Sequence, residues 1–199
     1  MAQNCAGGTL AAYVPDSNKP WNSLRVSHLY KRLAFGATYS EIQAGLLLTP
    51  GQLVDNLINA AKNAPLPAPP SWYNWSYTNY SDYTTESVQQ YQEWYFEWLK
   101  EMLTTSAREK IALFWHNHFV TRFLDYLCPS YMYEYHKLLQ QHAFGNFKTF
   151  LKEMGKSSAM LTFLDGRLNY KTVPNENYAR ELLELFTLGV NNGYTQQDI

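Results

Sequence analysis

Apolar residues recur at helical spacing along most of the chain, and no stretch alternates with the period of two that is typical of strands. The first amphipathic segment covers residues 24–35. The second begins at Thr38, which forms a capping-box pattern with Glu41 three residues later. Thr49 precedes Pro50, a residue favoured in the first turn of a helix, and so predicts the start of a third.

A segment rich in proline and aromatic residues, 64–85, interrupts this pattern. Its four prolines exclude a helix or a central strand at the start, and aromatic residues then alternate with Ser, Asn and Asp. We expect an ordered loop with Trp72 and Trp75 packed onto the helical body, because large apolar rings are costly to leave in water. The alternative is that these two indoles form a binding surface for a polymer such as a polysaccharide.

Helical spacing resumes after this loop and continues towards the carboxyl end. The segment 107–124 is apolar on every side, which predicts the most deeply buried helix. Ser106 and Glu109 form another capping-box pattern at its start. Pro129 interrupts the helical pattern after its end. The predicted helices cover about residues 86–104, 107–124, 130–143, 146–154, 157–164 and 174–189.

The predicted fold class is all-α, an irregular multi-helix bundle with a Pro- and aromatic-rich loop. Residues 1–23, rich in Gly, Pro, Asn and Ser, are expected to form an irregular amino-terminal arm, and residues 24–199 one helical domain. The predicted 86–104 helix carries apolar residues on one side. They are Val88, Tyr91, Tyr95, Trp98, Leu99 and Met102.

The composition is that of a globular protein, with 46% hydrophobic and 17% charged residues. The net charge of -1 provides no basic surface for nucleic acid. No apolar run approaches the roughly 18 residues that a membrane span needs, so no such span is predicted. The residues after Met1 suit the start of a mature secreted chain. Cys5 and Cys128 are either a disulfide pair or two separate thiols.

The stretch FWHNHF places His116, Asn117 and His118 inside an aromatic run. Positions two apart on a helix point to nearly opposite sides, so the two rings cannot both ligate one metal from a regular helix. One interpretation is a functional pair, with one ring in a site and the other supporting it. The other is that each ring is buried and hydrogen-bonded to a neighbouring helix.

The stretch PNENYARELLELFTLG predicts an acidic helix with Asn175 as its cap. Glu176, Arg180 and Glu184 are four residues apart, so the arginine can pair with both carboxylates along one exposed stripe. Glu181 falls off this stripe and near the apolar boundary. It is therefore the carboxylate that structure explains least and the candidate for a chemical role.

Five segments carry a resemblance to a known family. The chain resembles the bacterial domain-of-unknown-function family numbered 1800. The resemblance implies an exported protein, periplasmic or extracellular, that is mostly helical, usually longer than this chain, and often accompanied by an exported sulfatase-like partner. It implies no established activity and no catalytic residue. The segments are RLAFGATYSEI, REKIALFWHNHFVT, HAFGNFKTFL, AMLTFLDG and PNENYARELLELFTLG.

Two classes of function follow from these motifs. The first is an enzyme in which His116 or His118 meets Glu181 or Glu176, by acid–base chemistry or with a divalent metal as cofactor. The second is a non-catalytic surface or polysaccharide-binding module, or a scaffold of an exported assembly.

For the enzyme we expect one histidine ring within hydrogen-bond reach of Glu176, Glu181 or Glu184. The binding residues would be Asn117, Asn175, Glu176, Arg180, Glu184, Trp72 and Trp75, with His136 and His142 as reserve ligands.

Overall fold

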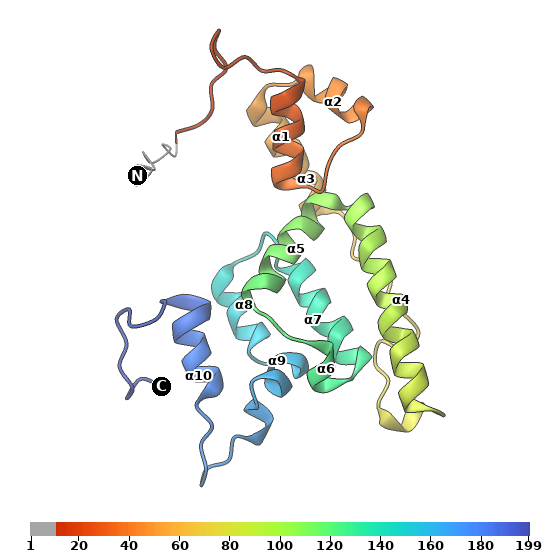
Figure 1. Cartoon of the computed structure of the whole chain (residues 1–199), viewed down its shortest axis with the longest axis vertical. Helices are drawn as coiled ribbons and strands as arrows, with labels where there is room; N and C mark the ends of the chain where they lie inside the picture. Colours follow the sequence, from red (N-terminus) through yellow and green to blue (C-terminus); the bar gives the residue numbers. More distant parts are fainter. Residues whose placement is uncertain (1–10) are drawn as a thin grey trace, which may run out of the picture.

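A computed structural model describes residues 11–199 of the chain. Over these residues the protein is all-α, with one isolated antiparallel bridge between Tyr170 and Val173 and no strand. Figure 1 shows a group of three amino-terminal helices beyond one end of a larger bundle, with the carboxyl-terminal helix along the bundle's side. The predicted fold class is confirmed. Cys5 lies outside the described residues, and so does the choice between a disulfide with Cys128 and two separate thiols.

The three amino-terminal helices enclose a small core of their own, in which Val26, Tyr30 and Leu53 are buried. Gly45 lies so close to this core that a Cβ atom would come within 2.8 Å of a methyl carbon of Val26, which explains the glycine. The capping box predicted at Thr38 is present, and Thr49 forms a second one with Gln52 at the predicted start of the third helix. The helices are α1 (Ser23–Leu33), α2 (Tyr39–Leu46) and α3 (Pro50–Asn63).

The main bundle is built around one central helix, α7, which contacts α4, α5, α8 and α9. Its core is largely aromatic and includes Phe119, Leu139, Phe150 and Met160, all shielded from solvent. The helices of the bundle are α4 (Tyr83–Thr104), α5 (Ser106–His118), α6 (Phe123–Tyr126), α7 (Pro129–Gln141), α8 (Phe147–Met154) and α9 (Ser158–Phe163).

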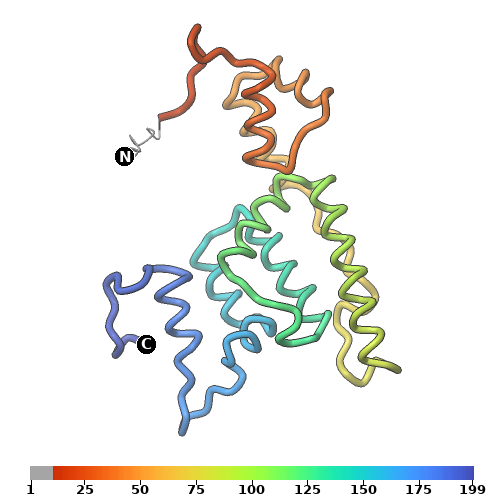
Figure 2. Tube along the Cα trace, in the orientation of Figure 1, coloured from red at the N-terminus to blue at the C-terminus, as the bar shows by residue number. Residues whose placement is uncertain are grey.

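The carboxyl-terminal segment runs outward after α9, turns back and returns as a helix, as Figure 2 shows. A 3-10 turn, η2 (Gly166–Leu168), precedes the turn-back. The returning helix starts as α10 (Asn177–Glu181) and continues as a π-helical segment, η3 (Leu182–Thr187). Phe186 is the residue that this segment places in the bundle core. The sequence predicted a regular helix here and did not indicate the π-helical part.

The prediction of one long buried helix over 107–124 is wrong. The helix α5 ends at His118, because Phe119 leaves helical geometry at φ -105° and ψ 56°, and α6 is a separate turn. Phe114 and Leu124 are 58% and 78% exposed, so the apolar residues on this segment do not all face the interior. The most buried helix is the central α7.

The capping-box prediction for Ser106 and Glu109 is also wrong. Ser106 is the first helical residue, and its hydroxyl oxygen accepts a hydrogen bond from the Phe35 amide at 2.9 Å. It therefore connects the end of α1 to α5 instead of capping its own helix. Glu109 is fully buried among side chains of α5 and α7.

The loop 64–85 is ordered by aromatic packing, as predicted. Trp72 is only 3% exposed and meets Trp94 and Tyr133 edge to face, with ring centroids 6.3 and 6.5 Å away. Trp75 is partly buried against the same cluster, and its carbonyl oxygen accepts the Ser130 hydroxyl at 2.8 Å. A 3-10 turn, η1 (Tyr77–Asn79), completes the loop.

Replacing Trp72 with Ala should lower the free energy of unfolding by about 3–5 kcal/mol, because it removes a buried indole from the contact between the loop, α4 and α7. The matched control is Tyr77→Ala, in the same loop but 75% exposed. It should change stability by no more than about 0.5 kcal/mol. Urea unfolding followed by circular dichroism measures both. Equal effects would contradict the packing role of Trp72.

Candidate functional site

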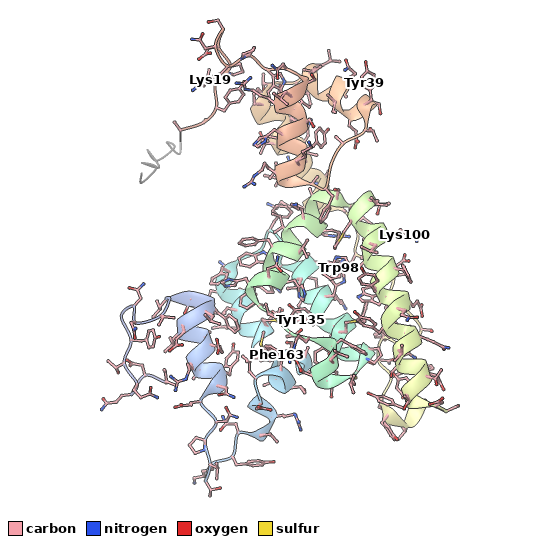
Figure 3. The ribbon with its side chains drawn as sticks, in the orientation of Figure 1. Lys19, Tyr39, Trp98, Lys100, Tyr135 and Phe163 are labelled. Carbon is pink, nitrogen blue, oxygen red and sulfur yellow. The ribbon has the colours of Figure 1, made fainter. Side chains whose placement is uncertain are left out.

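A cleft of about 650 Å³ opens between α4 on one side and α5, α6 and α7 on the other. This volume lies within the range of small-molecule sites. Figure 3 shows two of the lining residues, Trp98 and Tyr135, between these helices. The lining is mostly aromatic and aliphatic. It consists of Val88, Tyr91, Gln92, Trp94, Tyr95, Trp98, His116, Thr121, Arg122, Phe123, Leu124, Tyr126, Leu127, Met132, Tyr135, His136 and Leu139.

The predicted apolar side of α4 forms one wall of this cleft. Val88, Tyr91, Tyr95 and Trp98 line it, but Val88 and Tyr95 keep nearly half of their surface exposed. The side of α4 that is buried in the bundle is a different one, centred on Trp94. The prediction that these residues share one side of the helix is therefore confirmed for the four that line the cleft.

His116 is held in one tautomer by a short chain of hydrogen bonds. Its Nδ1 lies 2.8 Å from the Tyr135 hydroxyl, which itself donates to the Phe119 carbonyl oxygen at 2.6 Å. Because the tyrosine has a single hydroxyl proton and the carbonyl can only accept, Nδ1 of His116 must be the donor. The other ring nitrogen, Nε2, therefore carries a lone pair, and it has no hydrogen-bond partner within residues 11–199.

The surroundings of His116 keep this ring neutral. Burial lowers the pKa of His116 below its ordinary value, and the nearby imidazole of His136 lowers it further. Burial also raises the pKa of Tyr135 far above its ordinary value, so that the hydroxyl keeps its proton. A neutral imidazole with a free Nε2 lone pair can accept a proton from a bound molecule.

His136, the second imidazole in the cleft, faces a buried carboxylate. Its Nε2 lies 3.4 Å from Oε2 of Glu109, and both side chains are almost completely buried. The other carboxylate oxygen accepts hydrogen bonds from Arg108 Nε and Gln140 Nε2, each at 2.9 Å. Burial by itself raises the pKa of Glu109, but the nearby imidazole of His136 and the hydrogen bonds from Arg108 and Gln140 outweigh it and hold the pKa below its ordinary value. The carboxylate is thus ionised at neutral pH.

Trp98 stands between the two imidazoles. Its ring centroid lies 5.7 Å from that of His116 and 4.4 Å from that of His136. At this cleft, several buried polar atoms lack hydrogen-bond partners within the described chain: both ring nitrogens of His136, Oε2 of Glu109, the Thr121 hydroxyl and the indole nitrogens of Trp94 and Trp98. Buried polar atoms are usually hydrogen-bonded, so this concentration at one cleft marks it as a candidate site.

His118 points away from the cleft, as the spacing of two residues predicts. Its Nε2 bonds the Phe186 carbonyl oxygen at 3.0 Å, and its ring packs against Phe119. It therefore contacts the acidic helix through a backbone carbonyl, not through the carboxylate that we expected. Asn117 is exposed between the two histidines.

The acidic helix lies apart from the cleft. Arg180 bonds Glu176 and lies 3.9 Å from Glu184, which confirms the predicted pairing. Asn175 accepts the Asn177 amide at 2.9 Å, at the start of α10. Glu181, predicted as catalytic, has a buried carboxylate oxygen without a partner in the described residues, and it does not line the cleft.

The two reserve histidines have different surroundings. His136 belongs to the cleft, whereas His142 pairs with Glu153 of α8 at 3.0 Å. Within the described part of the chain, no group of three or more His, Cys, Asp or Glu side chains is arranged to hold a metal ion. The sequence did not identify Glu109, Trp98 or Tyr135 as site residues. The only available signal was an acidic residue in the first turn of a largely apolar helix.

A family model described as a protein of unknown function (DUF1800) matches residues 28–199. The chain belongs to the DUF1800 family. No curated protein and no solved structure matches it. None of the helices in the described part of this DUF1800 chain is both long and apolar enough to cross a membrane. The family match spans both motifs and the whole cleft, but it assigns no reaction.

Replacing His136 with Gln should raise the pKa of His116 towards 6.5, because it removes a neighbouring imidazole that disfavours the second positive charge. Burial should still keep the pKa below that value. Long-range ¹⁵N–¹H NMR titration measures this pKa and also reports the tautomer, with the proton expected on Nδ1. His142→Gln is the control and should leave the pKa of His116 unchanged. A proton on Nε2 would contradict the hydrogen-bond chain.

Replacing Glu109 with Gln should destabilise the fold by about 3 kcal/mol at neutral pH, because it removes one of the two carboxylates that compensate the buried charge of Arg108. Since the folded-state pKa of Glu109 is lowered, its contribution is present above the unfolded-state value of about 4.5 and is lost as the pH falls through the folded-state pKa. The variant should therefore lose less stability than the native chain over that acidic range. Glu176→Gln, at an exposed ion pair, should cost no more than about 1 kcal/mol.

Proposed function

We propose that the cleft between α4, α5 and α7 is the active site of an acid–base enzyme, with Nε2 of His116 as the general base. The observation that carries this proposal is the meeting of two imidazoles at one indole in an apolar cleft. One imidazole is kept neutral by burial and held in one tautomer by Tyr135, and the other lies beside the ionised Glu109.

Each imidazole suits a different half of proton transfer. His116 is neutral near pH 7 and presents a lone pair, so it can remove a proton from a bound molecule. We assign His136, whose Nε2 lies 3.4 Å from the ionised carboxylate of Glu109, the role of proton donor to the bound molecule. A proton donor and a proton acceptor on the two sides of Trp98 are the arrangement that general acid–base catalysis requires.

His118 and Glu181, which we also predicted as catalytic, have no part in this proposal. His118 bonds the backbone of η3, on the other side of α5 from the cleft. The alternative of a polysaccharide-binding surface on the aromatic loop has less support, because Trp72 is buried and its indole nitrogen donates to Glu93 at 2.9 Å.

We also propose that the enzyme acts outside the cytoplasm, in the periplasm or beyond the cell. The support is the resemblance of the motifs to an exported bacterial family, which also makes a sulfatase-like protein a candidate partner. Fractionation of producing cells tests the location. Recovery of the native protein only from the cytoplasm would contradict it.

The general base is tested with 5-nitrobenzisoxazole, a neutral aromatic probe. A base removes its ring C–H proton, the N–O bond breaks, and 2-cyano-4-nitrophenolate forms without any co-reactant. The native chain should accelerate this reaction, with a rate that rises with pH through the lowered pKa of His116 and then levels off. His116→Gln should reduce kcat/KM by about 100-fold or more.

His28→Gln is the matched control for this experiment, because His28 is exposed on α1, away from the cleft. It should leave the rate unchanged, and circular dichroism should show that both variants are folded. A native rate no greater than that of free imidazole, or an equal rate in the His116→Gln variant, would contradict the proposed function.

A further inference from the structure

The charges around the cleft point to the kind of molecule that it takes. Apart from its two histidines, Arg122 is the only charged residue in the lining. Its guanidinium is already paired with both carboxylate oxygens of Asp125, each at 2.8 Å. Behind His136 lies the ionised Glu109, which repels a negative charge. The cleft therefore offers no free cation to a phosphate, sulfate or carboxylate group.

The walls of the cleft suit a ring. Its aromatic lining includes Tyr91, Tyr95 and Trp98 of α4 and Phe123 and Tyr126 of α6. At one point the walls meet, where Tyr91 stacks on Phe123 with ring centroids 4.5 Å apart and an interplanar angle of 21°. Aromatic side chains gain most from stacking on another flat or ring-shaped apolar group.

Two of the unpartnered polar atoms at the cleft are donors that need an acceptor. Indole nitrogens can only donate, and those of Trp94 and Trp98 have no acceptor within the described residues. Trp98 is the half-buried one of the two and stands between the imidazoles. A carbonyl or ether oxygen on a bound molecule would satisfy this donor beside the base that attacks the same molecule.

We propose that the cleft binds an uncharged, ring-bearing molecule with at least one acceptor oxygen, and that it discriminates against the corresponding anion. That this molecule is a substrate rests on the proposed function. Its binding does not depend on the proposed function, because the charge, the aromatic walls and the donors are properties of the residues that line the cleft.

Two probes that differ in charge test the selectivity: methyl 2-naphthoate, an uncharged ester, and 2-naphthoate, its anion. Binding to the native chain is followed by NMR of the tryptophan indole N–H signals. The ester should bind roughly tenfold or more tightly than the anion, because the anion must lose its hydration in an apolar cleft without a cation. The Trp98 signal, assigned by its loss in Trp98→Phe, should be the most shifted.

Asp125→Asn provides the matched variant, because it removes the partner of Arg122 and leaves the guanidinium at the cleft rim free for an anion. This substitution should reduce the difference in affinity between the two probes, because it strengthens the binding of 2-naphthoate alone. Equal affinities in the native chain, tighter binding of the anion, no binding of the ester, or shifts confined to indoles outside the cleft would each overturn the proposal.

His116→Gln separates this inference from the proposed function. The variant should keep the preference for the ester over the anion, since that preference rests on the charges, the aromatic walls and the Trp98 donor. Selective binding of the ester, together with an unchanged benzisoxazole rate in His116→Gln, would support the proposed ligand class and contradict the role of His116 as the general base. A benzisoxazole rate that falls in His116→Gln, together with equal binding of the ester and the anion, would support the general base and contradict the ligand class.

Discussion

The buried guanidinium of Arg108 is the interaction on which the rest of this structure depends. Arg108 is only 2% exposed. It donates to the carbonyl oxygens of Ala64 and Pro65, at 3.1 and 2.8 Å, and to the carboxylates of Glu101 and Glu109, at 3.0 and 2.9 Å. One side chain thus joins the segment after α3, the end of α4 and the start of α5, and through Glu109 it reaches α7. Without it, two carboxylates near the junction of the helices would lose their compensating charge.

The candidate site takes its geometry from this junction. Glu109, fixed by Arg108 and Gln140, sets the position of His136 on α7. On the other side, α5 stops at His118, and the carbonyl of Phe119 becomes available to the Tyr135 hydroxyl. The same hydroxyl then orients His116. Both imidazoles are therefore placed by contacts between α5 and α7, whereas α4 contributes the apolar wall.

Local signals in the sequence predicted most of the fold, and tertiary competition explains where they failed. The capping boxes at Thr38 and Thr49 formed because all their atoms lie within four residues. The same pattern at Ser106 and Glu109 did not, because Phe35 and Arg108 provide stronger partners from elsewhere. Sequence spacing could show that the two histidines diverge. It could not show which helix each would meet, since that depends on packing between distant segments.

The hydrogen-bond chain behind His116 also restricts how protons can move. It runs from Nδ1 through the Tyr135 hydroxyl and ends at the Phe119 carbonyl oxygen, a backbone amide that does not take up a proton in water near neutral pH. This chain of hydrogen bonds therefore orients His116 and does not conduct protons. A proton captured at Nε2 has no route through the protein interior along this path, and it must leave by the nitrogen at which it arrived. The cleft that admits the bound molecule is then also the exit for its proton, and turnover becomes tied to return of that proton to the product or to solvent at the mouth.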